Sequence, residues 1–134
     1  MGSIVIGYVD TPAGNAALEA GIEEARRRGR PVVVVSSLHG GRSTGETETL
    51  ETMAASKRVR ERLVAEGIEC DVRDLVRGNT PAQDLIEVAR ENDVELIVIG
   101  IRRRSSTGKL ILGSNALEIL HDATVPVLCV KAAG

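Results

Sequence analysis

Short apolar runs recur along the chain and predict buried β-strands. Residues 3–9, 31–37, 94–100 and 126–130 are rich in Val and Ile and carry few charges. Strands of this kind are covered on both faces, which is typical of a parallel sheet between two layers of helices. Residues 68–76 alternate apolar and polar positions instead. One face of that strand is therefore solvated, and we expect it at an edge of the sheet.

Helical periodicity fills the intervals between these runs. The first helix is predicted over residues 13–28, with Gly29 as its stop and a buried face made of Ala17, Leu18, Gly21, Ile22 and Ala25. The second, between Thr47 and Glu66, has a looser apolar stripe, which consists of Leu50, Met53, Ala54, Val59, Leu63 and Val64. Thr80 and Pro81 predict the start of a third helix with Leu85, Ile86 and Ala89 buried, and Ser114–Leu120 forms the fourth.

The alternation of strands and helices predicts the α/β fold class. Right-handed crossovers turn this order into a doubly wound, five-stranded parallel sheet with helices on both faces. A chain of 134 residues with 43% hydrophobic content suits one core, so residues 1–134 are predicted to form a single domain. Residues 38–48 are a long connection, either a mobile lid or a disordered segment.

Composition and charge exclude several classes of protein. The chain has 17 basic and 19 acidic residues, a net charge of -2, and Tyr8 as its only aromatic residue, so we expect no nucleic-acid partner. No apolar run reaches the length of a membrane span, and no signal-peptide pattern precedes the first strand, so we expect a cytoplasmic protein without membrane contact. Cys70 and Cys129 are expected to be reduced, buried thiols. His39 and His121 lack partners at metal-ligand spacing, so no metal-binding residue is predicted.

The segment from Ile97 to Asn115 has the layout of an anion site. A buried strand ends at Gly100, a loop rich in Arg and Lys follows, and Gly113 and Ser114 open a helix. A helix amino terminus offers unpaired N–H groups and the positive end of a dipole, and nearby guanidinium groups favour phosphate. The alternative is a solvated basic loop followed by ordinary helix capping.

Asp10 is a second candidate, at the end of the first strand. In an open α/β sheet, ligands bind beyond the carboxyl ends of the strands where the winding reverses. If the first strand neighbours the fourth, Asp10 faces the cationic loop, where its carboxylate could accept from ribose hydroxyls or help to hold a metal with the phosphates. The alternative is that Asp10 or Thr11 caps the first helix.

Three common phosphate motifs are absent. Gly108-Lys109 is followed by Leu110 rather than Ser or Thr, so the segment is not a P-loop. No G-x-G-x-x-G follows the first strand, and the third strand is followed by Val76-Arg77-Gly78 rather than by a phosphoacceptor carboxylate.

The spacing of Gly100, Arg103 and Gly113-Ser114 resembles the G-x2-G-x9-G-[ST] motif of the universal stress protein family. The resemblance covers essentially the whole chain and extends to residues 4–10, 78–82, 96–100 and 125–130. It implies a five-stranded parallel sheet of strand order 3-2-1-4-5 with four helices, which holds ATP or a related adenine nucleotide with or without a companion Mg²⁺. The nucleotide-binding residues it implies are Asp10, Ser37, Ile99, Gly100, Arg102, Arg103, Gly113, Ser114 and Asn115.

Within this resemblance, Asp10 is the acid on the ribose or phosphate side, and Gly100 and Arg102 lie near the phosphates. The turn from Gly113 to Asn115 supplies donors at the helix start, and Ser36 and Ser37 correspond to the adenine edge. One position departs from the motif, because its second glycine is Arg103 here. Arg103 either swings outward or clamps a phosphate and preserves binding, or it narrows the site and excludes ATP.

The expected function is that of a stress-response protein that binds an adenine nucleotide and signals through its occupancy. No Ser-His-Asp set or catalytic carboxylate pair is evident, so we expect no enzyme, although slow ATP hydrolysis stays compatible with the sequence. The alternative is a nucleotide-independent, dimeric interaction module of the same fold. A homodimer is expected through residues 126–130, unless Lys131 and the last three residues blunt that edge.

Overall fold

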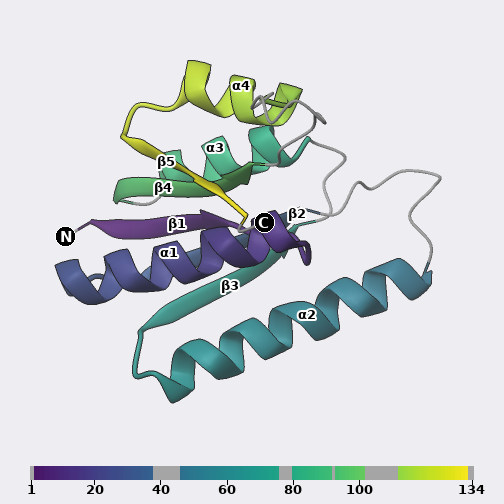
Figure 1. Cartoon of the computed structure of the whole chain (residues 1–134). Coiled ribbons are helices and arrows are strands. Elements are labelled where there is room, and N and C mark those ends of the chain that lie inside the picture. The colour runs from purple at the N-terminus through teal and green to yellow at the C-terminus, as the bar shows by residue number, and fades with distance from the viewer. Residues whose placement is uncertain (1, 38–45, 76–79, 92, 102–111, 133–134) are drawn as a thin grey trace.

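The computed structural model describes residues 2–37, 46–75, 80–91, 93–101 and 112–132. Strands and helices alternate along the chain (Figure 1): β1 Ser3–Gly7, α1 Pro12–Arg28, β2 Val32–Ser37, α2 Glu46–Ala65, β3 Cys70–Leu75, α3 Pro81–Glu91, β4 Val94–Ile101, α4 Ser114–Asp122 and β5 Val127–Lys131. Among these helices, none is both long and apolar enough to cross a membrane.

The strands form one parallel sheet in the order β3-β2-β1-β4-β5. The predicted fold class and strand order are therefore confirmed, as is the edge position of the alternating strand, β3. Its neighbour β2 pairs over its full length with β3, from Val32 opposite Cys70 to Ser37 opposite Leu75. The sequence-based element boundaries are within two residues of those observed.

Two apolar layers hold the helices on opposite faces of the sheet. Helices α1 and α2 cover one face, where Ile4, Ile6, Val34 and Val98 are fully buried, and α3 and α4 cover the other, as Figure 1 shows. Successive residues of a strand point to opposite faces, so a strand with Val or Ile at every position fills both layers.

Helix termini follow the capping chemistry in the sequence. The Thr11 hydroxyl accepts from the amide of Gly14 at 3.1 Å, and Gly29 ends α1 in the left-handed conformation with φ of 64°. Thr80 and Gln83 cap α3 reciprocally, each side chain accepting from the backbone amide of the other at 3.1 and 2.9 Å. This capping box satisfies two amide groups that a helix start leaves unpaired.

The buried face of α2 differs from the prediction. Val59 and Leu63 are buried as expected, but Leu50, Met53 and Val64 are 60, 53 and 64% exposed. The expected burial of Ala54 is also wrong, and the helix packs instead through Ala55, Val59 and Leu63, which are spaced four residues apart. In Figure 1 the first turns of α2 extend beyond the ends of the strands, so no sheet lies beneath them.

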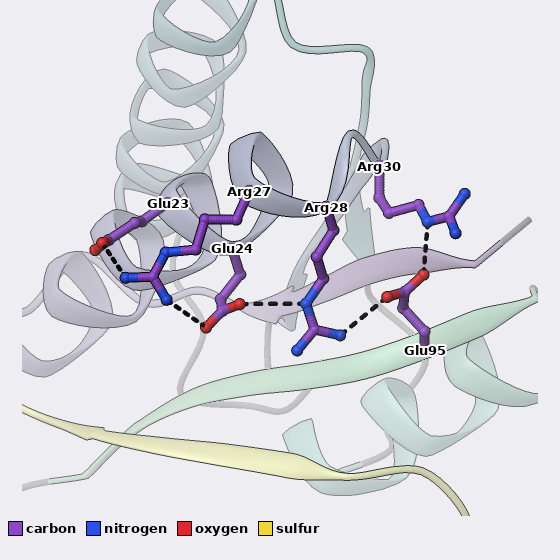
Figure 2. Close-up of polar contacts among 6 residues, drawn as sticks. All are labelled: Glu23, Glu24, Arg27, Arg28, Arg30 and Glu95. Carbon is purple, nitrogen blue, oxygen red and sulfur yellow. Dashed lines mark hydrogen bonds and ion pairs between the residues drawn. The ribbon is translucent and has the colours of Figure 1, made fainter.

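Ion pairs join the end of α1 to the start of β4 (Figure 2). The Arg28 guanidinium pairs with Glu24 at 3.2 Å and with Glu95 at 2.9 Å, and Glu95 also pairs with Arg30 at 2.8 Å. The side chains that end α1 are therefore neutralised by neighbouring carboxylates, and this arginine-rich stretch offers no excess positive charge to a polyanion.

The two cysteines are free thiols, as expected, and lie half-buried rather than buried. Burial raises the pKa of the Cys129 thiol, and it does the same for Cys70, where Arg60 opposes the shift. Both thiols therefore stay protonated at neutral pH and pack as small apolar groups.

Candidate functional site

The site forms where the winding of the sheet reverses. β1 has β2 on one side and β4 on the other, with Ile6 paired to both Val34 and Val98. The chain leaves β1 toward α1 and leaves β4 toward α4, so a crevice opens beyond the carboxyl ends of the two central strands. The condition set by the sequence, that the first strand neighbours the fourth, is met.

A cavity of about 290 Å³ occupies this crevice. Its walls come from the ends of β1, β2 and β4, the start of α1, and the facing sides of α3 and α4. The lining residues are Gly7, Tyr8, Val9, Gly14, Val35, Pro81, Leu85, Ile99, Gly100, Asn115, Ala116 and Ile119. The lining is mainly apolar, with the Asn115 amide as a polar group from α4. Such a pocket suits a flat, largely apolar ring system with a polar group at one end.

Gly100 is the next-to-last residue of strand β4, and its missing side chain has a packing cause. A Cβ atom at this position would overlap the carbonyl oxygen of Ala13 in the first turn of α1. Glycine is thus required for α1 to cross close to β4. The requirement holds whether or not a phosphate approaches this backbone.

At position 113, by contrast, packing does not require a glycine. Gly113 is the N-cap of α4 with φ of -71° and ψ of 168°, an extended conformation that any residue adopts. Apart from Gly113 itself and its chain neighbours, the described residues place no heavy atom within 4 Å of the position that its Cβ would occupy. The first bond within the helix runs from the Leu117 amide to the Gly113 carbonyl, so the preceding amides of α4 have no partner within the helix itself.

Ser114 and Asn115 follow in the first turn of α4, and both are exposed. Asn115 lines the cavity, and Ser114 is its immediate neighbour on the same open helix end. Of the predicted binding residues, the structure thus brings Ile99, Gly100 and Asn115 together around the cavity, with Gly113 and Ser114 beside it.

Asp10 lies at the end of β1 and makes contacts with α2. Its carboxylate lies beside the Arg58 guanidinium of α2 at 3.7 Å and the Tyr8 hydroxyl at 3.5 Å, on the face of the sheet that α1 and α2 cover. It lines a smaller hollow of about 60 Å³ with Tyr8, Val9, Ser36, Thr52 and Ala55. The alternative role as a cap falls to Thr11 rather than to Asp10.

For three of the predicted binding residues, the structure describes no side chain. Ser37 ends β2 beside β3, and its side chain lies outside the described residues, as do Arg102 and Arg103 and most of the 38–48 connection. Ser36, by contrast, is buried, and its hydroxyl donates to the Tyr8 carbonyl at 3.3 Å.

Tyr8 is the residue that the sequence reasoning missed. Its hydroxyl lies 3.1 Å from Asn15 Oδ1 and 3.5 Å from Asp10 Oδ1, and the residue is only 7% exposed. Burial, and then the nearby Asp10 carboxylate, raises the pKa of this phenol, while Arg58 opposes the shift. The sequence could have indicated this residue, because Tyr8 is the only aromatic residue of the chain and precedes Asp10 by two positions.

Comparison with known proteins extends over the whole chain. The sequence pattern of the universal stress protein family matches residues 1–131. A universal stress protein of Mycolicibacterium smegmatis is 37% identical over 134 residues, which cover 98% of both chains.

Solved structures agree with the sequence comparison. A universal stress protein from Archaeoglobus fulgidus is 39% identical with a TM-score of 0.85, over 98% of this chain and 99% of that one. A universal stress protein from the same organism, solved in complex with dAMP, is 32% identical with a TM-score of 0.78 over 98% of each chain. Together with the sheet order and the spacing of Gly100 and Gly113-Ser114, these matches show that the chain belongs to the universal stress protein family.

Proposed function

We propose that this protein binds an adenine nucleotide in the crevice between β1, β4 and the amino terminus of α4. The observation that carries the proposal is the combination of an apolar cavity of about 290 Å³ with an open helix start at its rim. The cavity suits the base, and the amides of the first turn of α4, which have no partner within the helix, suit a phosphate. The complex of a 32% identical relative with dAMP supports the same class of ligand.

ATP is the nucleotide we propose, with Mg²⁺ as its companion. The open space at Gly113 gives a phosphate room to approach the helix backbone, which a Cβ atom would narrow. The described residues contain no group of three or more metal-ligating side chains, so the ion in this proposal is held chiefly by the phosphates. The protein would contribute the amides of the Gly113 turn.

The proposed role is signalling by occupancy in the cytoplasm during stress, without catalysis. A ligand that binds one conformation better than another shifts their populations, and no bond needs to break.

Calorimetric titration with Mg-ATP and with dAMP tests the proposal, using two variants of one position. Asp and Asn are equally good N-caps, so Gly113→Asp and Gly113→Asn should fold alike. The Asp variant places a negative charge where the phosphate is proposed to bind, and we expect at least about a tenfold loss of ATP affinity. The Asn variant should stay within about threefold of the wild type.

If the two variants bind ATP with equal affinity, the phosphate does not bind at the amino terminus of α4. Thermal melting gives an independent measure, because a ligand that binds only the native state raises the midpoint with its concentration. A midpoint that stays constant up to millimolar Mg-ATP would contradict nucleotide binding.

The second candidate is a nucleotide-independent dimeric module, which the edge strand β5 favours. In the described sheet β5 pairs with β4 alone, and its four apolar residues are only half-buried. An apolar edge of this kind pairs readily with a symmetry mate. We propose a homodimer through residues 126–130 in either case, and the melting experiment separates the two candidates.

A further inference from the structure

The carboxylate of Asp10 is held from two sides. Arg58 Nη2 lies 3.7 Å from Oδ2, and the Tyr8 hydroxyl lies 3.5 Å from Oδ1. Arg58 comes from α2, which otherwise packs on the opposite face of the sheet from the cavity. A helix outside the nucleotide crevice thus reaches a residue at the end of β1.

Asp10 stands where two hollows adjoin. The larger cavity and the smaller one of about 60 Å³ share Tyr8 and Val9, and Asp10 follows these two residues directly. A group bound in the larger cavity that extends toward the end of β1 would meet the Asp10 carboxylate. In a nucleoside whose base fills the apolar cavity, that group is the sugar.

We propose that Arg58 is a positioning residue that orients Asp10 to accept hydrogen bonds from the ribose hydroxyls of the nucleotide. The proposal rests on the proposed function, and it identifies the ribose as the part of the ligand whose binding α2 affects through Arg58. An ionised carboxylate has about four lone-pair sites. Arg58 and Tyr8 each approach one oxygen, which leaves sites on both oxygens for the 2′ and 3′ hydroxyls.

We expect the Arg58–Asp10 ion pair to orient the Asp10 carboxylate rather than to stabilise the fold. The side chains of Arg58 and Asp10 are 65% and 59% exposed, and exposed ion pairs add little to folding. A carboxylate that is already oriented loses less conformational freedom when the ligand binds. The effect of Arg58 is therefore expected in the affinity for a ribose, with little change in the stability of the free protein.

The test compares ATP with 2′,3′-dideoxy-ATP, which lacks both hydroxyls, by calorimetry. The wild type is expected to bind ATP more tightly than the dideoxy analogue. Arg58→Ala should weaken ATP binding by about threefold to tenfold and dideoxy-ATP binding by less than about twofold, so the ratio of the two affinities falls. Arg58→Lys should restore part of the ratio, because it keeps the charge.

Two controls separate this role from a general attraction of phosphate. Lys57 is the adjacent cation on α2 and pairs with Glu61 at 3.9 Å, so Lys57→Ala should leave both affinities unchanged. In an Asp10→Asn background, Arg58→Ala should no longer alter the ratio, since residues that act through one another are not additive.

The possible results are distinguishable. If wild-type protein binds ATP but Arg58→Ala leaves the ratio unchanged or weakens both ligands equally, the inference about Arg58 is overturned and the proposed function stands. If the wild type binds neither nucleotide, both are overturned.

Discussion

The two glycines that flank the crevice differ in how much room their surroundings leave for a side chain. Gly100 lies against the Ala13 carbonyl, where a Cβ atom would overlap backbone, and Gly113 faces open space. Gly100→Ala must therefore move α1 away from β4, and we expect a loss of about 1–3 kcal/mol in the free energy of unfolding. Gly113→Ser adds a capping hydroxyl and should cause no loss. Urea unfolding of both variants checks this, and equal stability of the two would contradict the packing role of Gly100.

Tyr8 allows a direct measurement of its surroundings, because it is the only tyrosine. Its pKa is raised above the ordinary 10.0 chiefly by burial and next by Asp10. The folded state thus holds the phenolic proton more tightly than the unfolded state. This stabilisation is fully present below pH 10 and is lost as the pH rises through the higher folded pKa.

Alkaline titration followed by ultraviolet absorbance should accordingly give a midpoint above 10.0 in the folded protein and near 10.0 in urea. Asp10→Asn removes the second cause and should lower the folded midpoint. A folded midpoint at or below the urea value would show that the phenol is not shielded as described.

At the scale of elements, α2 shows how far an apolar pattern identifies a buried face. The helix carries apolar residues on more than one side, and Leu63 is fully buried whereas Leu50 is 60% exposed. Leu63→Ala should reduce the free energy of unfolding by about 2–5 kcal/mol. Leu50→Ala should change it by less than about 0.5 kcal/mol. Denaturant titrations compare the two directly, and similar losses would mean that α2 packs by another face.

Other elements were predictable because their signals are local. A strand covered on both faces needs apolar residues at successive positions, and Thr11 and Thr80 cap the helices that follow them through contacts three residues away. The buried face of α1 was predicted correctly, since its other sides carry charged residues and leave a single apolar stripe. In α2 several stripes compete, and the choice among them depends on β2 and β3.

For the whole molecule, the proposed dimer follows from the free edge of β5. The Ile97 amide donates to the Pro126 carbonyl at 3.0 Å. Because alternate residues of a parallel strand bond to the same neighbour, the amides of Leu128 and Val130 face β4 and that of Cys129 faces outward. Cys129→Pro should therefore remove an intermolecular donor while keeping the β4 ladder.

Light scattering should give the mass of two chains for wild type and Cys129→Ala and the mass of one chain for Cys129→Pro. Circular dichroism of the proline variant confirms that it is folded. A wild type with the mass of one chain would exclude the dimer, and a dimeric proline variant would place the interface elsewhere.

The sequence alone determined the fold class and the positions of the elements, because hydrophobic periodicity and capping residues act over short distances, and the family motif within it indicated the strand order and the crevice. It also located the open helix start at Gly113. Only the tertiary structure decided which stripe of α2 is buried, why position 100 is glycine, and that Asp10 lies beside Arg58. Each of these depends on contacts between elements far apart in the chain, and no local pattern encodes which side chains will meet there.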